Sequence, residues 1–242
     1  MNNTTPVIHL KNICYAYPAH PPVLDNLNLS IFEGQRIGLV APNGSGKTTL
    51  FHLIMGLLKP HAGTMEIFGK DIERERDFLA VRQQIGLLFQ DSDDQLFSPT
   101  VIEDVSFGPL NLGYDRDEAL EISRKTLAFL GLSEFEDRIT FKLSGGEKRL
   151  VSLATVLAMN PKVLLLDEPT TGLDQKTKFR LIDVIKSLSI TLLVISHDAD
   201  FLDATTDMRY TLKDGKIHTD SGEYLHRHVH HHGENLHPHK MT

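Results

Sequence analysis

The 242-residue chain has a formal net charge of −7 and 40% hydrophobic residues, the composition of a globular protein with a sizeable core. Its acidic balance argues against a general nucleic-acid surface, which would show a basic excess. No apolar run approaches the ~18 residues needed to cross a bilayer, the start lacks the features of a signal peptide, and the single cysteine allows no intramolecular disulfide, so we expect a chain of the cytoplasm.

The chain is predicted to begin with an antiparallel pair of strands, because apolar and polar residues roughly alternate over 7–17 and again over 27–32. The stretch 18–22 contains three prolines and separates the two strands as a loop. Tyr17 lies just before this loop. From the residues alone we interpret it as packed in the core or at a strand edge.

A glycine-rich turn then connects an apolar strand over 37–40 to an apolar helix over 50–58. Residues 41–49, Ala-Pro-Asn-Gly-Ser-Gly-Lys-Thr-Thr, fit the phosphate-binding pattern G-x-x-x-x-G-K-[ST] except at Ala41, where a methyl group is tolerable if φ is negative. Glycine lets backbone N–H groups approach phosphate oxygens, the lysine can reach the β- and γ-phosphates, and the threonine hydroxyl suits Mg²⁺. The turn therefore predicts a polyphosphate site, with an ordinary strand-turn-helix junction as the alternative. The residues of this candidate site are Asn43, Gly44, Ser45, Gly46, Lys47, Thr48 and Thr49.

Beyond this helix the pattern predicts a short hairpin over 64–72 and a charged helix over 73–82. An apolar strand follows over 84–89 and ends at Gln90, where polar and acidic residues begin.

The stretch from about 90 to 160 has helical periodicity and no strand pattern. We expect interruptions at Gly108-Pro109 and at Gly131, because both are turn signals. The stretch is interpreted as a helical subdomain inserted between strands of the core.

A second glycine motif, Leu-Ser-Gly-Gly-Glu at 143–147, opens a helix that is predicted to run to about Met159. The Ser144 hydroxyl can cap this helix, and the free N–H groups at its positive end favour an anion. The motif therefore predicts a second anion site.

Two buried strands are predicted over 163–166 and 191–195. The first delivers Asp167 and Glu168, and the second delivers His197, to the strand ends that face the ligand crevice in an open α/β sheet. Asp167 is suited to holding Mg²⁺ through water and Glu168 to orienting an attacking water, although two such acids could instead cap the next helix. A hairpin over 208–212 and 216–219 is expected to close the globular part.

Taken together, these motifs in this order resemble the ATP-binding cassette ATPases over about residues 7–218. The specific part is Leu-Ser-Gly-Gly-Glu, followed by Leu-Leu-Leu-Asp-Glu-Pro-Thr-Thr-Gly-Leu-Asp and by a histidine at the end of a strand. The resemblance implies an α/β fold of the P-loop NTPase type, with an antiparallel β subdomain and an inserted helical subdomain. We assign residues 1–219 to the ATPase domain. Because the composition shifts sharply beyond Thr219 and hydrophobic periodicity ends, residues 220–242 are interpreted as a histidine-rich, flexible C-terminal tail.

The resemblance also implies how ATP and Mg²⁺ are held. Tyr17 matches the aromatic residue that stacks on adenine, which replaces the core interpretation. The turn at 43–49 matches the phosphate cradle, and Thr48 matches a metal ligand. Gln90 matches the glutamine that contacts Mg²⁺ and the attacking water and that links the site to a transmembrane partner.

Other residues match the chemistry and the pairing of two cassettes. Asp167 matches the metal-binding acid, Glu168 the catalytic acid and His197 the sensor of the γ-phosphate. Ser144, Gly145 and Gly146 match the signature that touches a nucleotide held by another subunit, and Asp174 matches a residue that crosses the dimer contact. The resemblance therefore implies two chains that enclose two ATP molecules, either as a homodimer or as a mixed pair.

A narrower likeness lies at 89–101 and 103–109, which look like the ATPases of energy-coupling factor importers of the cobalt/nickel type. Those proteins drive the uptake of vitamins or of cobalt and nickel ions through separate coupling and substrate-binding membrane subunits. We therefore expect a peripheral ATPase at the cytoplasmic face of the membrane. A vitamin importer is the alternative, and a soluble cassette protein acting on DNA or ribosomes is a further one that the acidic balance disfavours.

The end of the chain is rich in histidine. Neutral imidazoles bind Ni²⁺, Co²⁺, Cu²⁺ and Zn²⁺, so these residues predict transient metal capture, with a purification tag or a merely solubilising tail as the alternatives. Together with the importer likeness, the tail favours cobalt or nickel as the cargo. The histidines concerned are His226, His228, His230, His231, His232, His237 and His239.

Overall fold

Two β-sheets and the helices packed against them make up residues 5–219, the part of the chain that this computed structural model describes. The larger sheet has the strand order β10-β9-β3-β8-β7-β6, in which only the β9–β10 pair is antiparallel. Its strands are β3 (Arg36–Val40), β6 (Ile85–Leu88), β7 (Val163–Asp167), β8 (Thr191–Ile195), β9 (Met208–Lys213) and β10 (Lys216–Thr219).

Strands β6, β7 and β8 are buried along their whole length, as expected for apolar runs in a parallel sheet that is covered on both faces. Alternate residues of β7 join different apolar clusters: Val163 and Leu165 belong to one, Leu164 and Leu166 to the other. The strands that deliver Asp167 and His197 are neighbours, because β7 pairs with β8 along its length.

The smaller sheet is antiparallel and has the order β2-β1-β4-β5. Its strands are β1 (Ile8–Ala16), β2 (Pro22–Ile31), β4 (Ala62–Ile67) and β5 (Lys70–Asp71). The predicted strand pair and the predicted hairpin are both confirmed. Strand β2 begins earlier than expected, because irregularities in the β1–β2 register break the strict alternation that marks a strand in the sequence.

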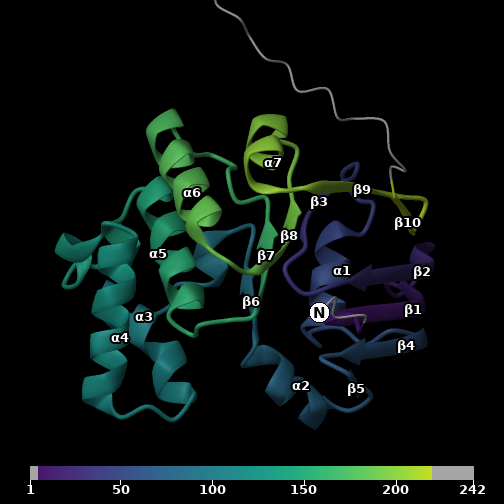
Figure 1. Cartoon of the computed structure of the whole chain (residues 1–242), viewed down its shortest axis with the longest axis horizontal. Coiled ribbons are helices and arrows are strands. Elements are labelled where there is room, and N and C mark those ends of the chain that lie inside the picture. Colours follow the sequence, from purple (N-terminus) through teal and green to yellow (C-terminus); the bar gives the residue numbers. More distant parts are fainter. Residues whose placement is uncertain (1–4, 220–242) are drawn as a thin grey trace, which may run out of the picture.

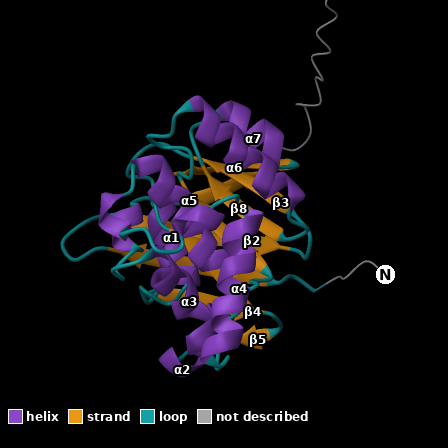
Figure 2. Ribbon diagram, turned by 90° about the vertical axis from the view of Figure 1, so that its left-hand side faces the viewer, coloured by secondary structure: helices purple, strands orange, loops and turns teal. Residues whose placement is uncertain are grey.

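The helices cover both faces of the larger sheet. They are α1 (Lys47–Ile54), α2 (Glu75–Arg82), α3 (Val101–Asn111), α4 (Arg116–Phe129), α5 (Gly145–Leu157), α6 (Gln175–Ser187) and α7 (Ala199–Thr205). Figure 1 shows α3, α4 and α5 on one side of the parallel strands and β1, β2 and β4 on the other. In the view of Figure 2, α6 and α7 lie at the opposite end of the molecule from α2 and β5. Within residues 5–219, no helix has the length and apolar character needed to cross a bilayer.

The predicted interruption at Gly108-Pro109 is wrong, because α3 runs through both residues and its chain turns only at Gly113, where φ is 94°. Pro109 lies in the last turn of the helix, so its missing N–H leaves only one carbonyl of the preceding turn without its usual partner. Gly108 lies against the end of α5, where a Cβ would come 3.6 Å from the carbonyl of Thr155 and 2.6 Å from the side chain of Met159, just beyond the helix. The glycine therefore serves close helix packing. The interruption predicted at Gly131 is confirmed by its φ of 60°, directly after α4.

Candidate active site

The glycine-rich turn between β3 and α1 has the backbone that the motif requires. Gly44 and Gly46 have φ values of 77° and 96°, in the left-handed region that favours glycine. At Gly46 a Cβ would also lie 2.6 Å from the Val23 side chain, so no larger residue fits there. Ala41 stands where the usual pattern has glycine. Its φ is not positive, so a side chain at this position introduces no backbone strain, and the residue is buried.

A cluster of polar side chains lies at the end of this turn, in which Lys47 and Glu168 are buried and His197 is half exposed. The ammonium of Lys47 donates to the carbonyl of Ala41 at 2.9 Å and to His197 Nε2 at 2.6 Å, and it lies 3.6 Å from Glu168 Oε1. His197 Nε2 lies 3.3 Å from the same Glu168 oxygen. The topology explains the cluster, because β3, β7 and β8 are parallel neighbours whose carboxyl ends meet at one edge of the sheet.

Glu168 has two unusual features. Its φ is 44°, a left-handed conformation that is uncommon for a residue with a side chain. Its Oε1 atom is buried and, within the described part of the chain, has no hydrogen-bond partner. Its Oε2 atom accepts a hydrogen bond from the backbone N–H of His197 at 3.3 Å. A strained residue with an unsatisfied buried oxygen is typical of a functional site.

Thr48 and Asp167 lie side by side next to this cluster, and the Thr48 hydroxyl donates to Asp167 Oδ2 at 2.7 Å. Asp167 is only 3% exposed. Burial raises its pKa, the hydrogen bond from Thr48 offsets part of that shift, and the neighbouring charge of Glu168 adds to it. A cation would relieve this unfavourable burial of charge. A hydroxyl and a carboxylate oxygen are the hard ligands that Mg²⁺ prefers, so the residues present fit that ion.

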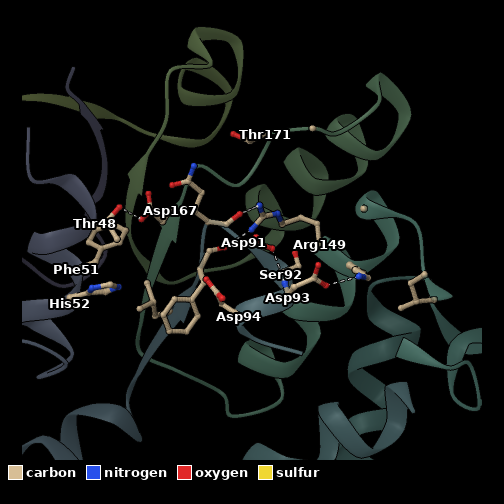
Figure 3. Close-up of a pocket in the computed structure, with 17 residues that line it drawn as sticks. Thr48, Phe51, His52, Asp91, Ser92, Asp93, Asp94, Arg149, Asp167 and Thr171 are labelled. Carbon is tan, nitrogen blue, oxygen red and sulfur yellow. Dashed lines mark hydrogen bonds and ion pairs between the residues drawn. The ribbon is translucent and has the colours of Figure 1, made fainter. Parts of the chain in front are cut away.

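The turn and the cluster line an open cleft of about 1310 Å³. Tyr17 and Gln90 line the same cleft. Tyr17 is 39% exposed and bonds to the Thr49 hydroxyl at 3.1 Å through its own hydroxyl, so the first interpretation of it as a core residue is wrong. The core position belongs to Tyr15, against which Tyr17 packs edge to face. Gln90 also lines a second hollow of about 650 Å³ on the α5 side (Figure 3).

Other predicted residues lie away from the cleft. Ser144 caps α5 and accepts from the backbone N–H of Glu147 at 3.4 Å, and Asp174 caps α6 and accepts from that of Thr177 at 3.0 Å. Gly146 lies between these two caps, since a Cβ there would come 3.3 Å from the Thr177 side chain. Gly145 lines the second hollow, on the side of α5. The alternative in which Asp167 and Glu168 cap the following helix does not hold, because Asp174 caps it.

The sequence did not single out Lys213 and Asp214, which also line the cleft. They lie at the β9–β10 turn, which reaches the cleft because the carbonyl of Gly215 accepts a hydrogen bond from the backbone N–H of Asp25 at 3.1 Å. The only signal for this turn was its Asp-Gly pair, which predicts a hairpin but not its tertiary neighbour. The histidines at 226–239 lie outside the described residues.

Residues 24–171 match the sequence profile of the family described as ABC transporter. The chain belongs to the ABC transporter family. It is 42% identical, over 87% of its own length and 69% of the relative's, to the energy-coupling factor transporter ATP-binding protein EcfA of Methanothermobacter thermautotrophicus. Its fold matches cbiO1 from Clostridium perfringens, described as part of the ABC transporter complex cbiONQ, with a TM-score of 0.78, 34% identity and coverage of 88% of this chain and 87% of that one.

A further solved structure is the ATP-binding cassette MJ0796, described as a dimer in a post-hydrolysis state bound to ADP and Pi. It matches with a TM-score of 0.79 and 29% identity, over 89% of this chain and all of that one. The ABC protein described here is therefore an ATPase that binds ATP, with the mixed α/β fold of the cassette. The family resemblance and the fold class predicted from the sequence are confirmed.

Proposed function

We propose that the cleft at the β3–α1 turn binds and hydrolyses ATP with the following division of roles. Lys47 and the backbone N–H groups of residues 43–49 hold the phosphates, while Tyr17 stacks on the adenine. Thr48, Gln90 and Asp167 would hold Mg²⁺, which would neutralise the charge that develops on the phosphate oxygens. The observation that carries the proposal is the convergence of three strand ends, from which Lys47, Glu168 and His197 lie within 3.6 Å of one another.

The proposed reaction is the in-line attack of water on the γ-phosphorus, with cleavage of the bond to the leaving ADP oxygen. Glu168 orients the water, since one of its carboxylate oxygens is buried without a hydrogen-bond partner in the described chain. His197 contacts the γ-phosphate, because it already lies against Lys47. Catalysis then arises from positioning and charge stabilisation.

We further propose that each complete site is shared between two chains, as a homodimer or a mixed pair. Ser144, Gly145 and Gly146 of one chain contact the nucleotide held at Lys47 of the other, and Asp174 lies at the contact between them. Support comes from the distribution of these residues: none of the four lines the cleft that contains Lys47. The cassette MJ0796, which this chain resembles, is described as dimeric.

The proposed cellular role is that of the ATPase of an energy-coupling factor importer, peripheral at the cytoplasmic face and docked on membrane subunits. The relative EcfA carries the name of such a transporter, and cbiO1 is described as part of a complex. An apolar groove of about 250 Å³ is available for docking. Phe97 and Phe107 line it, both are exposed, and their rings meet edge to face with centroids 4.8 Å apart.

We propose cobalt or nickel as the cargo. Support comes from the likeness of residues 89–109 to ATPases of the cobalt/nickel type and from the histidine-rich residues 226–239, which we propose to capture the ion transiently. The test is to extract the chain gently with its membrane partners, reconstitute the complex in vesicles, and measure ATP-dependent uptake of Co²⁺, Ni²⁺ and vitamins. Uptake of a vitamin alone would assign the chain to the alternative importer class.

The same vesicles test the tail. A chain that ends at Ser221 is expected to hydrolyse ATP normally but to take up Co²⁺ or Ni²⁺ more slowly at limiting ion concentration. Equal uptake and equal metal binding by the two chains would contradict metal capture by these histidines.

A further inference from the structure

Arg149 of α5 is a buried cation without a role in the chemistry proposed above. Only 4% of the residue is exposed, and its guanidinium donates to the backbone carbonyls of Phe89, at 2.5 Å, and of Gln90. Within residues 5–219 it forms no ion pair with a carboxylate. Burying a guanidinium is unfavourable unless its donors are satisfied, and its planar fork is suited to two neighbouring oxygens. The interaction therefore ties α5 to the start of the loop at residues 89–95, called here the Gln90 loop.

Two further side chains tie the same loop to α5. Lys148 Nζ lies 2.5 Å from Asp93 Oδ1. The side-chain amide of Gln95 donates to the carbonyl of Ser152 at 2.8 Å, and its oxygen accepts from the backbone N–H of Phe89 at 3.2 Å. The Gln90 loop is thus held to the helix at its beginning, middle and end. Of the three connections, only the one through Arg149 is made to Gln90 itself.

Gln90 lies where this connection meets the cleft, because it lines both the nucleotide cleft and the second hollow. Figure 3 shows Thr48 and Asp167 on one side of that hollow and Arg149 reaching toward the chain beside Asp91 on the other. An amide side chain near the start of a loop, such as that of Gln90, reaches a metal or a water reproducibly only if its backbone is fixed.

We propose that Arg149 is a positioning residue, which fixes the backbone of Gln90 so that its side chain faces Thr48 and Asp167. Through this contact the end of α5 that begins at Ser144 and the Gln90 loop move as one body. The inference rests on the proposed role of Gln90 at the ATP site.

The test compares Arg149→Lys with Gln90→Ala. Lysine keeps the charge but is a compact ammonium that cannot replace the two parallel donors. We expect kcat to fall about tenfold or more in each variant, because the amide is misplaced or absent, while the affinity for ATP is unchanged. In the double variant kcat is expected to fall no further than in Gln90→Ala, since both changes act through the same group.

Each outcome decides between the two proposals. If the two losses multiply, or if Gln90→Ala lowers kcat and Arg149→Lys does not, Arg149 does not act through Gln90 and the inference alone is overturned. If Gln90→Ala leaves kcat unchanged, the proposed role of Gln90 fails and the inference fails with it.

Arg36→Lys is the matched control, because Arg36 is a partly buried arginine that likewise holds backbone carbonyls, those of Ile185, Leu188 and Thr205, each at 2.8 Å. It is expected to lower the melting temperature without changing kcat. If Arg149→Lys does not fold, hydrogen exchange on the wild-type chain takes its place. Addition of a nonhydrolysable ATP analogue is expected to change protection of peptides covering 89–95 and 145–157 together, and a change in only one of them would overturn the inference.

Discussion

Glu168 combines backbone strain with an unsatisfied buried oxygen, and the surrounding sheet maintains both. The residue directly follows β7, and its backbone N–H donates to the carbonyl of Ile195 at 2.9 Å, which continues the β7–β8 ladder. This pairing holds the residue at a φ of 44°. A left-handed conformation of this kind costs on the order of 1–3 kcal/mol and persists where the neighbouring structure enforces it. The carboxylate is therefore placed toward Lys47 and His197 at the expense of stability.

At this scale we predict that Glu168→Gln binds ATP with nearly normal affinity but loses turnover. The amide has the shape of the carboxylate but cannot accept a proton from water, so kcat is expected to fall about 100-fold or more. The measurement is phosphate release under saturating ATP, together with ATP affinity by equilibrium titration. Glu121→Gln, which removes a carboxylate paired with Lys125 on the surface of α4, is the control and is expected to keep normal turnover. Turnover near the wild-type rate in Glu168→Gln would remove the assigned role.

The packing of α5 against β6 depends on a missing side chain. Gly86 lies in the middle of β6, and a Cβ there would come 2.2 Å from the side chain of Val156 in α5 and 3.2 Å from that of Pro161. The glycine therefore permits the close approach of the helix whose first residues follow Ser144. The same helix is joined to the Gln90 loop, so its distance from β6 affects the site.

We predict that Gly86→Ala destabilises the fold by about 1–3 kcal/mol, because the new methyl group overpacks the interface between helix and strand. Val156→Ala removes the atom that would clash. The loss of stability in the double variant is therefore expected to be smaller than the sum of the losses in the two single variants. Urea unfolding of the four proteins in this cycle measures the coupling. If the two single-variant losses of stability simply add, a methyl group at residue 86 does not clash with Val156, and the close approach of α5 to β6 does not depend on this glycine.

On the scale of the whole molecule, the two glycine motifs do not meet in the cleft that contains Lys47: Ser144, Gly145 and Gly146 are absent from its lining, although Thr48 and Gly145 both line the second hollow. The cleft contains Lys47, whereas Ser144 and Asp174 cap helices outside it and are joined through the contact of Gly146 with Thr177. In the arrangement proposed above, a second chain supplies Ser144, Gly145 and Gly146 to the nucleotide held at Lys47.

A mixing experiment tests this arrangement. Lys47→Ala and Ser144→Arg are each expected to abolish ATP hydrolysis, the first by loss of phosphate binding and the second by obstruction of the contact. When the two variants are mixed, a pair with one chain of each kind has one site with an intact lysine and an intact serine, so part of the activity is expected to return. Phosphate release from the mixture is compared with that from each variant alone. A mixture as inactive as its components would contradict a site shared between chains.

The order of the elements and most of the candidate site could be predicted from the sequence, because the signals involved are local. The turn at 41–49 requires glycine at particular backbone angles, and the apolar run at 163–166 is long enough to identify a buried strand without reference to its neighbours. The same local signals failed at Gly108, where a glycine that suggested a turn serves the packing of α3 against α5 instead.

Only the tertiary structure decided which residues of the site contact one another. The strand order brings β3, β8 and β7 side by side, and this order places Lys47 beside His197 and Thr48 beside Asp167 although they are distant in the chain. Arg149 has no signal in the sequence at all, because a basic residue on an amphipathic helix is ordinarily exposed. The physical reason is that periodicity and turn chemistry depend on neighbours along the chain, whereas burial and contact between distant residues depend on how the sheet is ordered and covered.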